Sequence, residues 1–252
     1  MSEATPRLLA LGDSAWTVEF GQTIDTATNA QVMALADQVH LAREHDPLFA
    51  HVLDVVPTFR SLTVHFSPWH TDAEGLAQRL LDLTHHSRAQ DIPGKHWRLP
   101  ACFDTDFAPD LLALAQGKHL QVHEVIEQLL ATSFRVYMIG FLPGFPYMGG
   151  WPKSLATPRL ATPRQRVPGH SLAVAGEMCA VYPWDSPGGW NLIGRTPVSL
   201  FDVRHTEQPA MLAAGDTVRR YAISTAEYTE MFAQCQSGQL ARDAFLNHEA
   251  QA

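Results

Sequence analysis

The residues best suited to chemistry gather in one stretch of the chain, between Phe134 and Asp202. Residues 141–200 hold 9 of the 17 prolines and 8 of the 16 glycines, so fixed and left-handed backbone torsions should shape this stretch rather than helical repeats. The same window has five basic residues and two acidic ones, whereas the whole chain carries a net charge of −8. A rigid, positive and aromatic-rich surface on an acidic protein predicts a site for a small anion or a specific partner, because nucleic acid usually selects a basic domain.

Two loops in this stretch present side chains on a frame of proline and glycine. In Gly140–Tyr147 the aromatic rings, Phe145 among them, have little conformational entropy left to lose on binding, although a hairpin that merely packs its rings would have the same composition. In Tyr182–Trp190, Asp185 and Ser186 could orient the polar groups of a ligand, whereas an Asx-type turn would give Asp185 a structural role.

Four arginines accompany these loops. Arg159, Arg164 and Arg166 recur along a proline-rich segment, where each is either a fork for a carboxylate or phosphate or a solvated charge, and their neighbours favour a site. Arg195 follows a GxxxxG string and differs from the lysine of a P-loop. A P-loop leads from a strand into a helix, whereas Pro197 and a β-like segment follow here, so we expect a β-turn that directs Arg195 outward or across a barrel mouth.

Other catalytic motifs are weaker. Gly169–Ala173 is one residue short of the GxSxG nucleophile elbow and precedes a β-like segment, so a surface turn is expected for Ser171. The 13 histidines do not pair on one helix face, as the five-residue spacing of His40 and His45 illustrates, so no metal site is expected in the chain alone.

The elements that must position these residues form two groups. In the first, residues 8–20 predict a strand after a turn at Gly12, and residues 51–56 and 61–66 predict two more. Residues 26–43 and 71–86 have helical spacing, which completes a compact α/β unit. The polar segment 89–95 contains Pro-Gly, so we place the boundary there and expect domains at residues 1–90 and 91–252.

The second group begins with a strand at residues 97–103 and two short helices at 109–116 and 121–131. The helix pair suggests a DNA-binding motif, but its acidic balance would repel phosphate, so core packing is the expected role. Short strands and a last helix follow, at residues 135–141, 170–176, 179–183, 196–202, 216–223 and 224–236. Many short strands separated by Pro and Gly turns predict a closed barrel or a sandwich.

The composition sets broader limits. A content of 46% hydrophobic and 17% charged residues is that of a globular protein. Three widely spaced cysteines form neither a disulfide framework nor a zinc pair, so we expect a cytoplasmic protein. The sequence shows no leader pattern and no apolar run of ~18 residues, so we expect neither cleavage nor a membrane partner.

Four ordered motifs make a family resemblance specific: GFLPGFPYMGG, PRLATPRQRVP, YPWDSPGGWNLIGRTP and LAAGDTVRRY. They resemble the family that contains the B subunit of 5-oxoprolinase, the kinase inhibitor KipI and the first half of the carboxyltransferase part of urea carboxylase. The resemblance implies an α+β fold, with a small N-terminal α/β domain followed by a C-terminal cyclophilin-like β-barrel. Departures from the usual pattern at Leu130, Phe134, Gly169–Ser171 and Glu177–Ala180 concern the partner surface and the substrate more than the fold.

The resemblance also implies a function, which is that of the B subunit of an ATP-dependent 5-oxoprolinase. Together with partner subunits C and A, this subunit would open the lactam of 5-oxoproline to L-glutamate. ATP and Mg²⁺ would act in the assembled complex, and the site would need cations for developing phosphate charge and a clamp for the substrate carboxylate. Arg195, Asp185 and Ser186 are the expected catalytic residues. The expected substrate-binding residues are Phe145, Tyr182, Trp190, Arg159 and Arg164.

Two other functions stay open at this point. A KipI-type inhibitor would dock a sensor histidine kinase and perform no chemistry. A carboxyltransferase subunit would act on urea or a related amide and would need a biotin-bearing partner.

Overall fold

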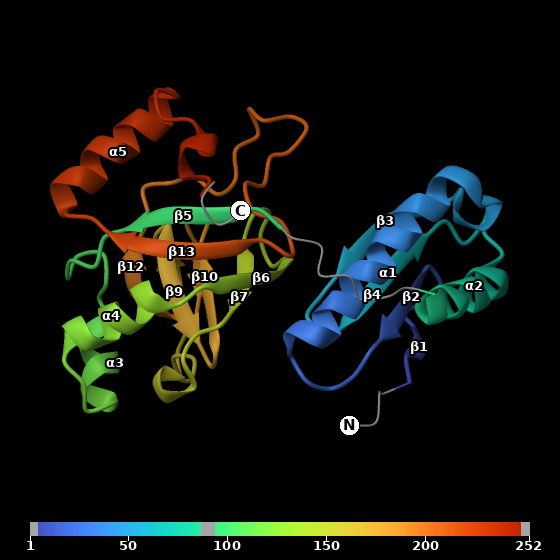
Figure 1. Cartoon of the computed structure of the whole chain (residues 1–252), viewed down its shortest axis with the longest axis horizontal. Coiled ribbons are helices and arrows are strands. Elements are labelled where there is room, and N and C mark those ends of the chain that lie inside the picture. The colour runs from blue at the N-terminus through green and yellow to red at the C-terminus, as the bar shows by residue number, and fades with distance from the viewer. Residues whose placement is uncertain (1–4, 87–93, 248–252) are drawn as a thin grey trace. The chain divides into compact units, whose positions relative to one another are not determined.

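The computed structural model describes residues 5–86 and 94–247, and the chain divides into two compact units, Met1–Pro93 and Gly94–Ala252 (Figure 1). The boundary predicted at residue 90 lies outside the described residues. Within the described ranges, no helix is long and apolar enough to cross a membrane.

The N-terminal unit is a four-stranded antiparallel sheet with the strand order β1-β2-β4-β3. Its strands are β1 (Arg7–Ala10), β2 (Ala15–Glu19), β3 (Val52–Pro57) and β4 (Ser61–Phe66), and its helices are α1 (Thr26–His45), α2 (Ala73–His86) and the short 3-10 helix η1 (Pro47–Phe49). Alternate residues of β4 are fully buried beneath the helices, as the period of two requires. The strands and helices predicted for this unit are confirmed.

The second unit is built around a seven-stranded sheet that curls into a nearly closed barrel (Figure 1). Its order is β12-β9-β10-β7-β6-β13-β5, with β13 parallel to β5 and the other pairs antiparallel. The strands are β5 (His96–Ala101), β6 (Phe134–Ile139), β7 (Pro146–Gly149), β9 (Ser171–Ala175), β10 (Met178–Val181), β12 (Asn191–Arg195) and β13 (Thr217–Ala222). Where the first and last strands meet, the backbones of Cys102 and Arg195 exchange two hydrogen bonds of 2.8 and 2.9 Å. The α+β fold with a C-terminal barrel is confirmed.

Smaller elements surround the barrel. They are the helices α3 (Leu111–Gly117), α4 (Val122–Ala131) and α5 (Thr225–Ser237), the 3-10 helices η2 (Lys153–Leu155) and η3 (Arg242–Phe245), and a two-stranded ribbon of β8 (Arg164–Val167) and β11 (Ser186–Gly188). Helix α5 begins where expected, because Ser224 and Glu227 form a capping box.

The two faces of the barrel sheet have different partners. On β9 and β10, Leu172, Val174 and Cys179 belong to the large core, whereas the alternate residues Ala173 and Ala180 belong to a separate cluster with aromatic side chains. This second cluster packs beneath the proline-rich loops, so the loops predicted to carry the site lie against the outer face of the sheet.

Three local predictions are wrong. Ser171, expected in a surface turn, is 2% exposed and begins strand β9, because it pairs with Arg195 of β12.

The other two wrong predictions concern the segment at residues 196–202 and the residues just before Arg195. Residues 196–202 form no strand apart from the isolated bridge of Phe201 with Ala210, because Val198 and Leu200 owe their apolar character to burial in the core rather than to sheet pairing. The expected β-turn before Arg195 is strand β12, which accommodates its glycine through a register shift between Leu192 and Gly194.

Candidate functional site

A cavity of about 420 Å³ lies on the outer face of the sheet, within the ~300–1,000 Å³ typical of small-molecule sites. It is enclosed by the loop before β7, the segment before β8 and the ribbon strand β11, and we call it the aromatic pocket. Its lining residues are Phe141, Leu142, Phe145, Tyr147, Arg159, Pro163, Tyr182, Ser186, Pro187, Gly188, Gly189 and Trp190.

Phe145 forms the centre of the aromatic wall. Its ring is fully buried and meets Tyr147, Tyr182 and Trp190 edge to face, at centroid distances of 4.9, 5.1 and 6.0 Å. Each pair has the geometry that aromatic quadrupoles prefer. The wall is therefore rigid before any ligand arrives.

Phe141 stands at the mouth of the aromatic pocket in a strained conformation. Its φ is +68°, which bulky residues rarely adopt, and the residue is 61% exposed. The loop holds this torsion through hydrogen bonds from Gly140 N to the Phe145 carbonyl (3.1 Å) and from Leu142 N to the Gly140 carbonyl (2.8 Å). An exposed aromatic ring held under strain beside a cavity indicates a functional role for the loop.

Gly188 lets the ribbon approach the wall. A Cβ atom added there would lie 2.7 Å from Tyr182 Cζ and still closer to the Tyr182 hydroxyl, whereas one at Gly189 would meet nothing nearer than Pro163 at 3.6 Å. The close approach therefore requires glycine at position 188 only.

The Arg159 guanidinium and the Ser186 hydroxyl are polar groups of the aromatic pocket whose hydrogen-bonding capacity is unused among the described residues. The Arg159 guanidinium lies 5.8 Å from the Trp190 ring centroid and has no hydrogen-bond or ion-pair partner among the described residues. The Ser186 hydroxyl is buried and likewise has no partner there. Burial raises the pKa of Tyr182 and of Tyr147, so both phenols stay protonated at neutral pH.

This lining suits a small, flat anion. The guanidinium can bind a carboxylate, the hydroxyl can donate or accept one hydrogen bond, and the rings can cover apolar atoms. The described lining contains no Asp, Glu or His, so the pocket offers no carboxylate or imidazole for proton transfer.

The structure brings together five of the predicted site residues, namely Phe145, Tyr182, Trp190, Arg159 and Ser186. Arg164 lies behind the wall instead. It pairs with Asp110 at 2.6 Å and donates to the Trp190 carbonyl at 3.5 Å, while Asp110 also accepts from Leu192 N at 2.6 Å. Arg164 therefore supports Trp190 and β12 and does not line the cavity.

Asp185 and Arg195 also lie outside the aromatic pocket. Asp185 accepts from Gly169 N at 2.7 Å and pairs with Arg166 at 2.6 Å, and these two contacts lower the pKa of its carboxyl. It therefore anchors another turn rather than its own backbone. Arg195 donates from Nε to the Gly169 carbonyl at 2.9 Å. The expectation that Arg195 and Asp185 lie in one site with Arg159 is wrong, because β12 carries Arg195 to the seam of the barrel and Asp185 is held by Gly169 and Arg166.

Tyr147 was not assigned to substrate binding from the sequence, although it lines the aromatic pocket. Its position in the same proline- and glycine-rich loop as Phe145 was the available signal. Pairing of β6 with β7 sets its direction, through a register shift between Val136 and Met138 that local sequence does not reveal.

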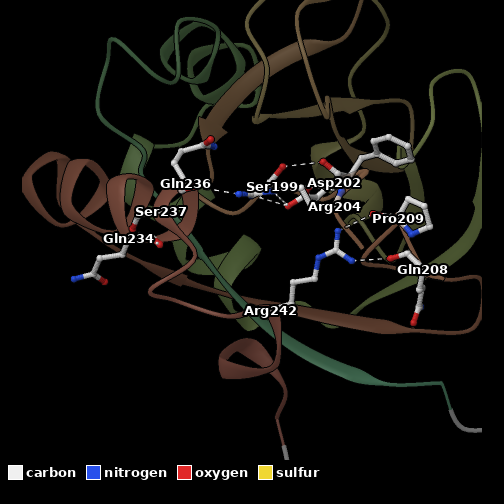
Figure 2. A network of polar contacts seen from close by, with 10 residues as sticks. Ser199, Asp202, Arg204, Gln208, Pro209, Gln234, Gln236, Ser237 and Arg242 are labelled. Carbon is white, nitrogen blue, oxygen red and sulfur yellow. Dashed lines mark hydrogen bonds and ion pairs between the residues drawn. The ribbon is translucent and has the colours of Figure 1, made fainter. Parts of the chain in front are cut away.

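A second cavity of about 280 Å³ lies between residues 198–205 and the segment after α5. Its arginines are already engaged, as Figure 2 shows: Arg204 contacts Asp202 through bonds of 2.7 to 3.0 Å, and Arg242 donates to the Gln208 and Pro209 carbonyls at 2.8 and 2.7 Å. These contacts tie the loop after residue 200 to the C-terminal segment, so we interpret them as structural.

An α/β unit followed by a nearly closed barrel, with a cavity of small-molecule size against the barrel sheet, places the chain in the α+β class. Residues 6–212 match the model of the carboxyltransferase domain, subdomain C and D, and the chain belongs to this family.

Relatives and a solved structure agree with this assignment. The chain is 34% identical to the 5-oxoprolinase B subunit of Bacillus subtilis over 86% of its own length and 93% of the relative, and 40% identical to that of Haemophilus influenzae over 67% and 78%. The crystal structure of TTHA0988 superposes with a TM-score of 0.71 at 31% identity. This match covers 83% of the chain but only 40% of TTHA0988, so the chain spans about two fifths of that protein.

Proposed function

We propose that the chain is the B subunit of an ATP-dependent 5-oxoprolinase, which opens the lactam of 5-oxoproline to L-glutamate with subunits C and A. The similarity to proteins of that name over most of their length supports this proposal. The observation that carries it is the aromatic pocket itself, where a guanidinium and a hydroxyl without partners among the described residues lie beside a rigid aromatic wall.

In this proposal Arg159 binds the carboxylate of 5-oxoproline, and the faces of Trp190 and Tyr182 cover its flat ring. The Ser186 hydroxyl would hydrogen-bond the lactam amide, because it is buried at the pocket wall and has no other partner in the described part of the chain. Phe141 would contact the partner subunit that completes the site. The exclusion of water by the wall would strengthen the ion pair of Arg159 with its ligand.

The lining of the aromatic pocket does not suit Mg²⁺, the ion that accompanies ATP in phosphoryl transfer. Mg²⁺ prefers carboxylate and phosphate oxygens, and the described pocket lining contains no carboxylate. Among the described residues, no three His, Cys, Asp or Glu side chains gather in a group that could hold a metal. We therefore propose that another subunit contributes the residues that hold ATP and Mg²⁺, and that this chain positions the lactam.

Reconstitution tests the proposal. The purified chain is mixed with subunits C and A, and glutamate release from 5-oxoproline is measured with and without ATP. We expect ATP-dependent release that requires all three proteins, with the Bacillus subtilis relative as the positive control. No release under conditions where the control works would reject the proposal.

Carboxyl transfer is a second candidate, because the matching family model describes a carboxyltransferase domain. Under this alternative, the assembled complex would consume a carboxylated biotin carrier and transfer the carboxyl group to urea or a related amide. Incorporation of labelled bicarbonate into the amide, without hydrolysis of 5-oxoproline, would favour it.

A further inference from the structure

A ring of side chains lies at the seam of the barrel, away from the aromatic pocket. His170 meets Phe232 at a centroid distance of 5.5 Å, Phe232 stacks on Tyr228 at 6.0 Å, and Tyr228 meets Phe107 at 4.6 Å. The Arg195 guanidinium lies 5.7 Å from the Phe107 ring, and its charge acts on both His170 and Tyr228. We call these five residues the Arg195 ring.

The position of the histidine in this ring is strained and firmly held. His170 has a φ of +68°, a torsion that glycine would adopt at lower cost. Its backbone N–H donates to the Tyr182 carbonyl at 2.6 Å, and its carbonyl accepts from Thr196 N at 3.0 Å. Asp185 and Arg195 bind the two backbone groups of Gly169 just before it. A side chain fixed in this way at a left-handed torsion points to a role for the imidazole.

Three groups of the Arg195 ring keep unused hydrogen-bonding capacity. Arg195 is oriented by its Nε bond to the Gly169 carbonyl, and no described residue accepts from its two terminal nitrogens. The Tyr228 hydroxyl also has no partner among the described residues, and burial raises its pKa, so it remains a donor.

His170 supplies an acceptor. Its Nδ1 lies 3.2 Å from the Val198 carbonyl, which can only accept, so Nδ1 carries the proton and Nε2 is left with a lone pair. Burial lowers the pKa of the imidazole, and the positive charge of Arg195 lowers it further. The hydrogen bond to Val198 and the negative charge of Asp185 act in the opposite direction. The half-buried ring therefore stays neutral at neutral pH.

We propose that the Arg195 ring is a second binding site, for a small carboxylate that also carries an N–H or O–H donor. Arg195 and Tyr228 donate to the carboxylate, His170 Nε2 accepts from the ligand's donor, and the rings of Phe107 and Phe232 flank its carbon atoms. The site is separate from the aromatic pocket and does not depend on the 5-oxoprolinase activity.

Acetate and glycolate are the probes, because they differ by the one hydroxyl that His170 would recognise. Nuclear magnetic resonance at constant ionic strength follows the Arg195 Nε–H signal in the full chain. We expect saturable shifts with both probes and dissociation constants in the millimolar range, with glycolate bound about three- to tenfold more tightly, as one neutral hydrogen bond allows.

Variants test separately the roles proposed for His170 and Arg195. In His170→Asn, which tolerates the left-handed torsion, we expect acetate binding to persist and the preference for glycolate to vanish. In the Arg195→Gln variant the His170 ring signal is followed instead, and we expect neither probe to bind. Arg159→Gln, in the aromatic pocket, should leave the affinity for both probes unchanged. Arg195→Lys, which keeps the charge but not the planar fork, replaces Arg195→Gln if that variant unfolds, and should bind at least about tenfold more weakly.

Equal affinity for the two probes in the unmodified chain would overturn the proposal, as would binding that survives Arg195→Gln. The absence of a saturable shift up to about 50 mM of either probe would also overturn it. Glutamate release from 5-oxoproline by the reconstituted complex would remain possible in each case, so the two proposals fail separately.

Discussion

Replacing Gly188 with alanine should deform the aromatic pocket from within. The added Cβ would lie 2.7 Å from Tyr182 Cζ, whereas ordinary contacts begin near 3.4 Å, so the ring or the ribbon must shift by about 0.7 Å or more. Tyr182 is 1% exposed and lines the aromatic pocket, so its ring can yield only by moving into that cavity. Overpacking of this kind costs about 1–3 kcal/mol, which lowers the melting temperature of a domain of this size by about 2–12 °C.

Gly189→Ala is the matched control, because its Cβ would meet Pro163 at an ordinary 3.6 Å. Neither glycine has a positive φ, so the comparison isolates the steric effect. Calorimetry measures the melting temperatures, and the reconstituted complex gives KM for 5-oxoproline, which should rise in Gly188→Ala only. Adding Tyr182→Phe removes the nearest atom and should restore part of the lost stability. If Gly188→Ala matched Gly189→Ala in both stability and KM, the proposed wall geometry would be refuted.

Three further predictions concern charge and hydrogen bonding. Arg159→Gln should raise KM for 5-oxoproline about 10- to 150-fold in the glutamate-release assay, since a charged hydrogen bond is lost, while Arg166→Gln, whose side chain is 79% exposed, should change it less than about threefold. Ser186→Ala should not lower the urea midpoint, because it removes a buried hydroxyl without a partner among the described residues, and it should raise KM about 2- to 12-fold; an unaltered KM would show that the hydroxyl does not touch substrate. Hydrogen bonding from Arg204 lowers the pKa of Asp202 from 3.8 to about 2, so the stability from this pair is present above pH 3.8 and is lost as the pH falls towards 2. The urea midpoint of the unmodified chain should therefore fall more steeply in that window than that of Arg204→Gln, and parallel curves would contradict the assignment.

Local sequence predicted the elements whose signals are themselves local. The helices at residues 26–45 and 225–237 have apolar periodicity and side-chain caps, and these features depend only on neighbours in the chain. The same reasoning gave a wrong strand prediction for residues 196–202, because an apolar alternation does not distinguish a paired strand from a buried loop.

The candidate site was predictable in composition but not in arrangement. Phe145, Tyr182 and Trp190, which the aromatic and glycine motifs grouped, line one cavity because their loops pack against the same face of the sheet. The local sequence around Arg159 and around Arg195 does not reveal that the two residues lie at different places in the fold. The closure of the barrel between Cys102 and Arg195, a contact of high sequence separation, is what takes Arg195 to the seam.

The most direct test of the central claim is a crystal structure of the assembled complex with 5-oxoproline bound. We predict that the ligand's ring lies against Trp190 and Tyr182 in the aromatic pocket, with its carboxylate about 2.7–3.2 Å from the Arg159 guanidinium. A fully ordered 5-oxoproline elsewhere, with the aromatic pocket empty or filled by side chains of another subunit, would contradict the account.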